Sequence, residues 1–403
     1  MKQFEQTSIV SVDYECDVCV CGGGIAGIAA ALSAAREGKR VILLERGFML
    51  GGLATAGLVT IYLPLCDGKG HQVSFGIAEE LLRLSIVYGA ESRYPRAWLE
   101  GGTYEEKCEK RFEVQFNAQL FAMKAEELLQ DEGVKILYGA TCASVRLEGG
   151  RITHIVIEGK SGKQAIEVGM SVVDTTGDAD ICHQSGAKTA IYQGGYGNVL
   201  AAWYYKYSEG QYGLKMLGYC ESPDPEANAR PLVKRRYTGV ETEELSEMMQ
   251  DSHRATLNDL AAARATTPDT VPTTIATIPQ TRMTRRLVGK YTIDDSEMFK
   301  SFEDSVGLFS DWRKRGPVYE LPYRTLYGGE VKNLFAAGRC MSVTDPMWDI
   351  TRVIPVCAVT GEAAGLAAAM ATEAEAVDVK ALQAKLSQRG VALRHGEIVK
   401  SEE

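Results

Sequence analysis

The sequence predicts an α/β protein: a main domain with a parallel sheet and flanking helices, a small antiparallel layer beside that sheet, and an inserted α+β domain. Three observations predict this fold. Residues 17–45 have the pattern of a strand, a glycine turn, a helix and a second strand. Two later apolar runs, at 171–177 and 333–339, also lead into glycine, whereas residues 186–320 are aromatic and contain proline. At 403 residues the chain is long enough for two or three domains.

The first unit is built around the sequence GGGIAG at residues 22–27. In such a strand-turn-helix, Gly22 allows the tight turn, Gly24 lets backbone N–H groups approach a pyrophosphate, and Gly27 lets the helix pack closely on the sheet. The diphosphate then lies at the positive end of a helix dipole. Glu45 ends the second strand, where its carboxylate can accept hydrogen bonds from a ribose. The unit therefore predicts a Rossmann-like dinucleotide site.

A second glycine turn follows directly, in the sequence RGFMLGGLAT at residues 46–55. The Gly51-Gly52 pair is typical of a turn whose backbone another group can approach closely, and residues 54–57 have small side chains. We expect a bulky ligand to lie against this backbone.

The middle of the chain alternates between helical and strand patterns. Residues 58–104 are an excursion from the main domain, with a helix around 77–88 and aromatic loops near 94–98. Helical spacing returns within 112–131, and a strand follows at 134–138. Further short strands, the first two joined by a Gly149-Gly150 hairpin turn, are predicted to form the antiparallel layer at 141–147, 152–158 and 165–168.

Two later segments return to the main-domain pattern. The sequence VVDTTGDAD at 172–180 is an apolar strand that ends in small and hydroxylated residues, although a plain strand exit would explain it equally well in isolation. Residues 333–339 are a buried strand that leads into Gly338. We expect a loop at 345–351, then a long alanine-rich helix over 352–370 whose N-terminus faces a ligand. The charged tail after Thr372 is expected to be helical and peripheral.

The segment 186–320 is assigned to a substrate-facing domain that contains a polar helix over 241–265. It also carries three arginines, Arg282, Arg285 and Arg286, within five residues. These guanidinium groups can hold a carboxylate or phosphate through bidentate hydrogen bonds. They can equally form a solvated face or pair with the acids that the chain has in excess, and the sequence leaves these alternatives open.

The expected domain organisation is discontinuous. Residues 1–57, 105–185 and 322–403 form the nucleotide-binding domain, and residues 58–104 and 186–321 form the substrate or cap domain. We expect no separate domain for a second dinucleotide, because no second GxGxxG follows a strand.

Composition and charge exclude several classes of partner. The formal net charge of −9 disfavours nucleic acid and anionic membrane surfaces as partners. Residues 1–15 lack the basic start and apolar core of a secretion signal, so a cytoplasmic location is expected. Residues 18–35 are uncharged, but their glycine cluster favours the strand-turn-helix over a membrane span.

The ten cysteines are too sparse for a disulfide scaffold. Strand alternation places Cys19 and Cys21 on one face and Cys16 on the other, so no metal site is expected from this group. The five histidines are scattered, and no metal ligand set is predicted.

Four stretches together resemble the FAD-dependent oxidoreductase family of two-domain flavoproteins, which shares its nucleotide fold with the glutathione reductase and succinate dehydrogenase groups. They are GGGIAG with Glu45, RGFMLGGLAT, VVDTTGDAD, and NLFAAGRCMSVT followed by RVIPVCAVTGEAAG. The resemblance implies noncovalent FAD, and the several glycine-lined strand ends favour this long cofactor over NAD. The implied FAD-binding residues are Gly22, Gly24, Ile25, Ala26, Gly27, Glu45, Arg46, Gly51, Gly52, Ala54, Thr55, Thr176, Gly177, Gly338, Arg339, Ile354, Val356 and Cys357.

The resemblance also implies hydride transfer between FAD and a small, anionic organic substrate. A positive helix end near Arg352 would stabilise the anionic reduced flavin. Arg282, Arg285, Arg286 and Arg352 are the candidate catalytic residues. In the family the second position of the arginine motif is commonly Glu, and here it is Met283.

Other roles for the flavin stay open at this point. Cys340 and Cys357 are 17 positions apart and are interpreted as packing residues rather than a redox pair. A flavin with a structural or non-redox role, of the isomerase or lyase type, is the alternative function. An RNA-modifying flavoprotein is disfavoured by the acidic charge balance. The electron donor or acceptor and the oligomeric state are left open.

Overall fold

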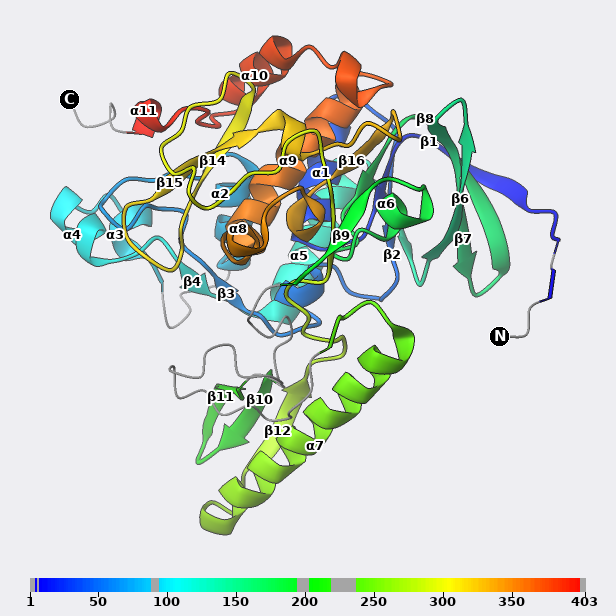
Figure 1. Cartoon of the computed structure of the whole chain (residues 1–403). Coiled ribbons are helices and arrows are strands. Elements are labelled where there is room, and N and C mark those ends of the chain that lie inside the picture. The colour runs from blue at the N-terminus through cyan, green and yellow to red at the C-terminus, as the bar shows by residue number, and fades with distance from the viewer. Residues whose placement is uncertain (1–3, 6, 88–93, 194–202, 219–236, 399–403) are drawn as a thin grey trace.

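The computed structural model describes residues 4–5, 7–87, 94–193, 203–218 and 237–398. Most of these residues form one large body around a mixed sheet, and a smaller body projects from it (Figure 1). The projecting body consists of a three-stranded antiparallel sheet and one long helix. Its elements are β10 (Trp203–Ser208), β11 (Gln211–Met216), α7 (Thr242–Thr266) and β12 (Val271–Ile275).

The parallel part of the main sheet is confirmed. It has the order β5-β2-β1-β8, and a further strand, β16, also pairs with β8. All these pairings are parallel. The strands are β1 (Ser11–Cys21), β2 (Val41–Glu45), β5 (Lys135–Tyr138), β8 (Gly162–Asp174) and β16 (Leu334–Ala336).

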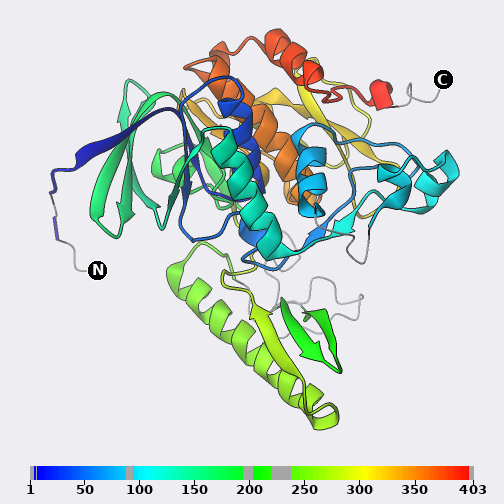
Figure 2. The same ribbon diagram turned by 180° about the vertical axis from the view of Figure 1, so that it is seen from behind.

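Helices α1 (Ile25–Ala35), α5 (Ala118–Asp131) and α9 (Ile354–Met370) share one buried core with the first face of this sheet (Figure 2). Glycine in α9 allows close contact with α1. A Cβ at Gly361 would lie 2.3 Å from the carbonyl oxygen of Ala26, and a Cβ at Gly365 would lie 2.1 Å from that of Ala30. The two helices therefore pack backbone to backbone.

The predicted strand at 165–168 and the apolar strand that begins at 171 are parts of one long strand, β8. Its first half, residues 162–167, pairs antiparallel with β7, and its second half, 172–174, pairs parallel with β16. β1 follows β8 along both halves, because it begins at Ser11 rather than near Asp17. The antiparallel layer is therefore a continuation of the main sheet.

The predicted hairpin is confirmed as β6 (Thr141–Glu148) and β7 (Arg151–Gly159). Gly149 and Gly150 form its turn with φ of 58° and 80°, a left-handed conformation that favours glycine. Ile152 and Ile155 of β7 are buried in the core on the second face of the sheet.

The predicted side-chain directions of the β1 cysteines were wrong for Cys16. Cys16, Cys19 and Cys21 all belong to the buried cluster on the second face. The pairing of β1 with β8 shifts register between Cys16 and Val18, and this irregularity breaks the strict alternation of side chains. Among the described residues, no group of three or more His, Cys, Asp or Glu side chains is arranged to hold a metal ion.

Much of the expected cap is built into the core of the large body. Tyr62, Leu81 and Phe309 are buried in the same cluster as α1 and α9. The division into a nucleotide-binding and a substrate-facing domain therefore stays a prediction. The cap elements concerned are β3 (Ile61–Tyr62), α2 (Ile77–Ser85), α3 (Arg96–Leu99), β14 (Ser305–Ser310) and β15 (Val318–Pro322). The neighbouring elements α4 (Tyr104–Glu109) and β4 (Val114–Gln115) lie, apart from Tyr104, in the segment 105–185 that was assigned to the nucleotide-binding domain.

Residues 345–351 form helix α8 (Asp345–Thr351), not the predicted loop. Pro346 lies in the first turn of this helix, where its fixed φ is favourable. Helix α9 consequently begins at Ile354, and Arg352 ends α8 instead of starting α9. Among the described residues no single helix is long and apolar enough to cross a membrane, and α8 and α9 reach that composition only as a pair bent by 93°.

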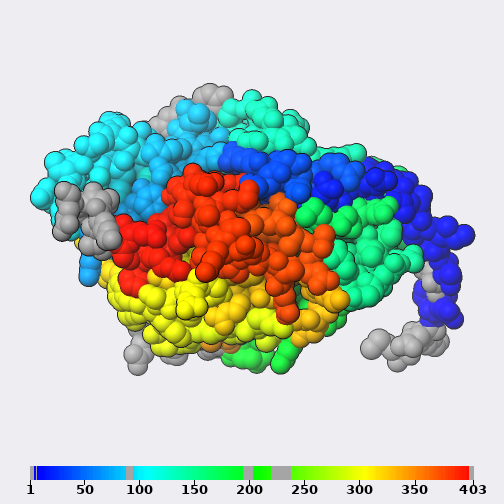
Figure 3. All heavy atoms as spheres, turned by 90° about the horizontal axis from the view of Figure 1, so that it is seen from above, coloured from blue at the N-terminus to red at the C-terminus, as the bar shows by residue number. Residues whose placement is uncertain are grey.

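The C-terminal tail is helical, as predicted, but it is packed more firmly than expected. Leu382 and Leu386 of α10 (Val379–Gln388) are buried in the main core. Arg394, just before α11 (His395–Ile398), pairs at 3.0 Å with the buried carboxylate of Glu320. From above, this orange and red segment lies between the cyan and the yellow parts of the chain (Figure 3).

Candidate cofactor and substrate site

A cavity of about 760 Å³ runs along the carboxyl ends of β1, β2, β8 and β16. Its first end lies beside Glu45 and its far end beside Arg282. The described residues that line it include Glu45, Arg46, Phe48, Ala140, Thr141, Cys142 and Asp180 at the first end; Gly22, Gly24, Ile25, Ala26, Gly51, Gly52, Ala54, Thr176, Gly177, Gly338 and Arg339 in the middle; and Val59, Ile61, Leu63, Trp203, Ile278, Pro279, Arg282, Trp312, Arg352, Ile354 and Cys357 at the far end.

The glycine loop has the geometry that its sequence requires. Gly22 has φ of 112°, and a Cβ there would lie 2.4 Å from the carbonyl oxygen of Thr175. A Cβ at Gly27 would lie 1.8 Å from the carbonyl oxygen of Gly22, so this glycine serves the packing of α1 on the sheet. At Gly24 a Cβ would meet nothing within 4 Å, which leaves its backbone open to a ligand.

Two helix N-termini face the cavity. Gly24 precedes α1 and Val353 precedes α9, and among the described residues no side chain caps either helix. Ile25 and Ile354, the first residues of the two helices, line the cavity. The free N–H groups and the positive ends of the helix dipoles are suited to anionic or electron-rich groups.

Glu45 lies at the first end of the cavity, with both carboxylate oxygens hydrogen-bonded to the backbone. Gly23 N–H donates to Oε2 at 2.9 Å, and Gly47 N–H donates to Oε1 at 2.6 Å. A carboxylate oxygen can accept more than one hydrogen bond, so the group is held in place and still has acceptor capacity for a ligand. Its role toward a ribose stays a proposal.

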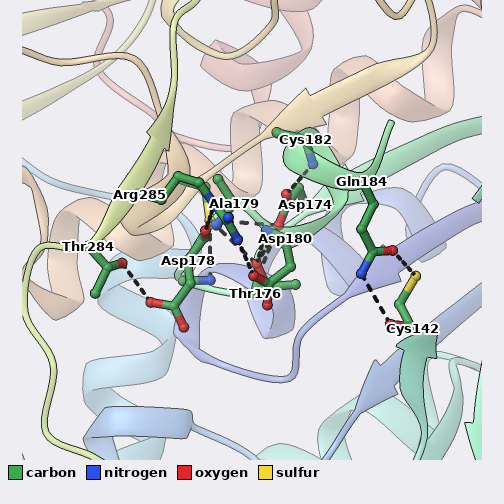
Figure 4. Close-up of polar contacts among 12 residues, drawn as sticks. Cys142, Asp174, Thr176, Asp178, Ala179, Asp180, Cys182, Gln184, Thr284 and Arg285 are labelled. Carbon is green, nitrogen blue, oxygen red and sulfur yellow. Dashed lines mark hydrogen bonds and ion pairs between the residues drawn. The ribbon is translucent and has the colours of Figure 1, made fainter. Parts of the chain in front are cut away.

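The loop after β8 is organised by buried acceptors (Figure 4). Asp174 accepts hydrogen bonds from the N–H and hydroxyl groups of Thr176 and from the N–H of Cys182. The Cys340 sulfur accepts from the N–H groups of Gly177 at 3.2 Å and Ala179 at 3.3 Å. Burial raises the pKa of the Cys340 thiol well above its ordinary value, so it remains a neutral packing and acceptor group.

Arg339 joins this loop to the segment that carries the arginine motif. Its Nη2 lies 3.2 Å from Asp178, and its Nη1 donates to the carbonyl oxygens of Thr281 and Arg282. Asp178 also accepts the hydroxyl of Thr284 at 2.7 Å. Arg339 therefore holds the backbone of residues 281 and 282 in place.

The structure separates the three arginines of the motif. Arg282 lines the cavity, is only 7% exposed, and has its guanidinium 5.3 Å from the ring centre of Trp203. Arg285 and Arg286 do not line the cavity. The two latter residues were expected as candidate catalytic groups, and that role stays a prediction to which this cavity lends no support.

Arg285 and Arg286 form ion pairs instead. Arg285, in β13 (Arg285–Leu287), pairs at 2.7 Å with Asp180 of α6 (Asp180–Gln184). Arg286 pairs at 3.0 Å with Asp345, and β13 pairs with β9 (Thr189–Ile191). Burial and the nearby Asp178 raise the pKa of Asp180 to about 6. Both arginines therefore pair with acids of the chain, which was one of the alternatives left open by the sequence.

Arg352 lines the far end of the cavity, just before α9. Its Nε donates to Asp349 at 3.0 Å, and Nη2 donates to the same carboxylate oxygen. Its guanidinium lies 5.9 Å from the ring centre of Trp312, which also lines the cavity. Arg352 is thus a fixed cation beside the N-terminus of α9.

Three predicted cofactor residues, Gly27, Thr55 and Val356, do not line the cavity. Thr55 donates its hydroxyl to the carbonyl oxygen of Leu50 and stabilises the Gly51-Gly52 turn. Val356 is buried in the core between α9 and its neighbours. Sequence reasoning missed Trp203 and Trp312 as lining residues, because neither lies in one of the four stretches that resemble the FAD-dependent family.

A family model described as FAD dependent oxidoreductase matches residues 17–199 and 196–386. The chain belongs to this family. FAD is therefore its cofactor, and the residues fit it: an open glycine backbone and two uncapped helix N-termini face one long cavity.

Curated relatives match only short segments of this flavoprotein. A thioredoxin reductase from Ureaplasma parvum is 37% identical over 76 residues, which is 18% of the chain and 25% of that protein. A vinyl phenol reductase from Lactiplantibacillus plantarum is 38% identical over 89 residues, 21% of the chain and 17% of that protein. The matched part thus spans a quarter or less of the length of these relatives.

Solved structures resemble the flavoprotein over most of its length at low identity. A geranylgeranyl bacteriochlorophyll reductase-like protein from Thermoplasma acidophilum has a TM-score of 0.46 and 14% identity, with 93% of this chain and 82% of that chain covered. A 3-ketosteroid dehydrogenase from Rhodococcus jostii has a TM-score of 0.41 and 15% identity, with 90% and 98% covered.

Proposed function

We propose that this oxidoreductase transfers hydride between noncovalently bound FAD and a small, anionic organic substrate. The observation that carries the proposal is the continuity of the cavity. One space of about 760 Å³ connects the glycine loop and Glu45 with an apolar far end that contains Arg282 and Arg352. A long cofactor and a substrate can therefore meet in the same site.

The assigned roles follow from the position of each group. Residues 22–26 would hold the diphosphate at the N-terminus of α1, and Glu45 would hold the adenosine ribose. Gly338, Ile354 and Cys357 would lie against the isoalloxazine. When bound, FAD supplies the group that accepts or donates hydride.

The chain contributes electrostatics at the reacting end. The N-terminus of α9 places positive partial charge there, which favours a reduced, anionic ring system. Arg282 and Arg352 both line this end, and Arg352 pairs with Asp349. We expect this end of the cavity to attract and orient an anionic substrate.

The first experiment is a visible spectrum of the purified, FAD-reconstituted protein, followed by anaerobic addition of organic acids. A flavin band that bleaches on addition of substrate supports hydride transfer. Turnover without transient bleaching supports the alternative in which FAD has a non-redox role. Absence of a flavin band after reconstitution would contradict the proposed mechanism at its first step.

A further inference from the structure

We propose that Asp349 is a positioning residue for the flavin: it orients Arg352 and balances its charge, and it thereby keeps the reduction potential of bound FAD below the value that an uncompensated arginine would give. The inference rests on the proposed function, because it takes the part of the cavity beside the N-terminus of α9 as the place of the isoalloxazine. Asp349 does not line the cavity, and none of the four stretches that resemble the family contains it.

Arg352 lies at the corner between two helices in the cavity wall. It ends α8, Val353 precedes α9, and the two helices are bent by 93° relative to each other. Arg352 lines the cavity together with Ile354, the first residue of α9, and its side chain is 16% exposed. The Sγ of Cys357, a third lining residue, lies 3.6 Å from the carbonyl oxygen of Arg352. Arg352 therefore brings its charge to the same part of the cavity as the positive end of the α9 dipole.

Asp349 holds two lining side chains from behind the cavity wall. Its Oδ1 accepts a hydrogen bond from Nε of Arg352 at 3.0 Å and a second one from Nη2. Its backbone carbonyl oxygen accepts the Nε1–H of Trp312 at 2.9 Å. The carboxylate thus fixes Arg352, whereas the backbone fixes Trp312. A substitution of the Asp349 side chain changes the first contact and preserves the second.

The charges around Asp349 are balanced. Its Oδ2 lies 3.5 Å from Nη1 of Arg313, but Arg313 has its own partner in the buried Asp311, which accepts from Nε and Nη2 at 3.0 Å. Lys314, 3.9 Å from Asp311, is 57% exposed, and its charge is screened by solvent. Two arginines therefore face two aspartates. Loss of the Asp349 charge would leave an excess positive charge at Arg352.

This excess charge would act on the cofactor through a partly buried site, where charges interact more strongly than in water. A flavin that becomes anionic on reduction is stabilised by nearby positive charge, so its reduction potential rises. Loss of Arg352 would have the opposite effect, because Asp349 would then carry the uncompensated charge. Loss of both groups restores the balance.

The test is the reduction potential of bound FAD, measured anaerobically against a redox dye of known potential, so no substrate is required. At the potential that half-reduces the natural protein, Asp349→Asn should raise the ratio of reduced to oxidised flavin about tenfold or more, equal to about 30 mV for a two-electron couple. Arg352→Gln should lower the ratio by a similar factor. The double variant should return to within about threefold of the natural protein, whereas two merely disruptive substitutions would add their effects.

Asp304→Asn is the matched control, because Asp304 also pairs with an arginine, Arg324, and neither residue lines the cavity. It should leave the ratio within about twofold of the natural value. Asp349→Glu keeps the charge and should lie closer to the natural protein than Asp349→Asn. The flavin band and the thermal transition show that each variant is loaded and folded.

An unchanged ratio in Asp349→Asn, or a double variant that shifts as far as either single variant, would overturn the inference. Both results leave FAD binding and hydride transfer to a substrate intact. A protein without a flavin band after reconstitution would instead contradict both proposals, so the two failures can be told apart.

Discussion

Glu362 of α9 caps the N-terminus of α2: its Oε2 accepts the N–H of Ile77 at 2.9 Å. The side chain is almost fully buried, and burial raises its pKa to about 7, while the Ile77 N–H and Arg389 act in the opposite direction. The contact requires glycine at position 76, because a Cβ there would lie 2.5 Å from the Glu362 carboxylate.

This contact predicts a pH-dependent stability. The pKa of Glu362 is raised on folding, so the folded state holds its proton more strongly, and stability falls as pH rises from about 4.5 through about 7. Glu362→Gln keeps an acceptor for Ile77 without the charge and should be more stable than the natural protein at pH 8, by roughly 1–3 kcal/mol. Thermal unfolding at pH 5 and pH 8 measures the difference. Glu109→Gln, an exposed replacement on α4, is the control, and an identical pH slope in Glu362→Gln would contradict the assignment.

The close contact between α1 and α9 predicts a packing limit at Gly365. Because a Cβ would lie 2.1 Å from the carbonyl oxygen of Ala30, Gly365→Ala must push the helices apart. We expect a loss of about 1–3 kcal/mol in the free energy of unfolding, measured with guanidinium chloride. Gly396→Ala, in a short helix where a Cβ meets nothing within 4 Å, should change stability by less than about 0.5 kcal/mol. Equal stabilities of the two variants would show that the helices can separate freely.

The open backbone at Gly24 predicts a variant that loses cofactor but not stability. A Cβ at Gly24 meets no atom within 4 Å, so Gly24→Ala should unfold at nearly the same temperature as the natural apoprotein. The same methyl group would block backbone approach to the diphosphate, and FAD affinity should fall about tenfold or more. Titration of the apoprotein with FAD measures this affinity. Gly22→Ala should lose stability as well, because its Cβ would clash with Thr175 in a left-handed backbone.

The sulfur of Cys340 predicts a difference between two small substitutions. Cys340→Ala leaves the N–H groups of Gly177 and Ala179 without this acceptor and should cost about 1–3 kcal/mol of stability, together with weaker FAD retention. Cys340→Ser keeps an acceptor at the same place and should lie closer to the natural protein. Unfolding curves and the rate of FAD release measure both effects. If Ala and Ser behave alike, the sulfur serves as a space-filling group only.

The sequence by itself determined the features that depend on local sterics. The tight turn at Gly22, where φ is 112°, and the Gly149-Gly150 hairpin turn were both predicted, because each needs a residue without a side chain. The parallel sheet and the positions of the glycine-lined strand ends follow from the same local patterns. The predicted cofactor residues that line the cavity are concentrated within 22–26, 51–54 and 338–339, and their role toward FAD stays a prediction.

Only the tertiary structure decided which charged and aromatic side chains reach the cavity. Arg282 and Arg285 are three residues apart, yet Arg282 lines the cavity and stacks on Trp203, whereas Arg285 does not line it and pairs with Asp180. A register shift in β1 likewise moved Cys16 to the face opposite to the one predicted. The position of a charged side chain depends on partners far away in the sequence: Trp203 and Arg282 are more than 75 positions apart. The face to which a strand residue points changes when the register shifts by a single residue. The glycine motifs thus determine where the cofactor binds, whereas long-range packing decides what lies beside it.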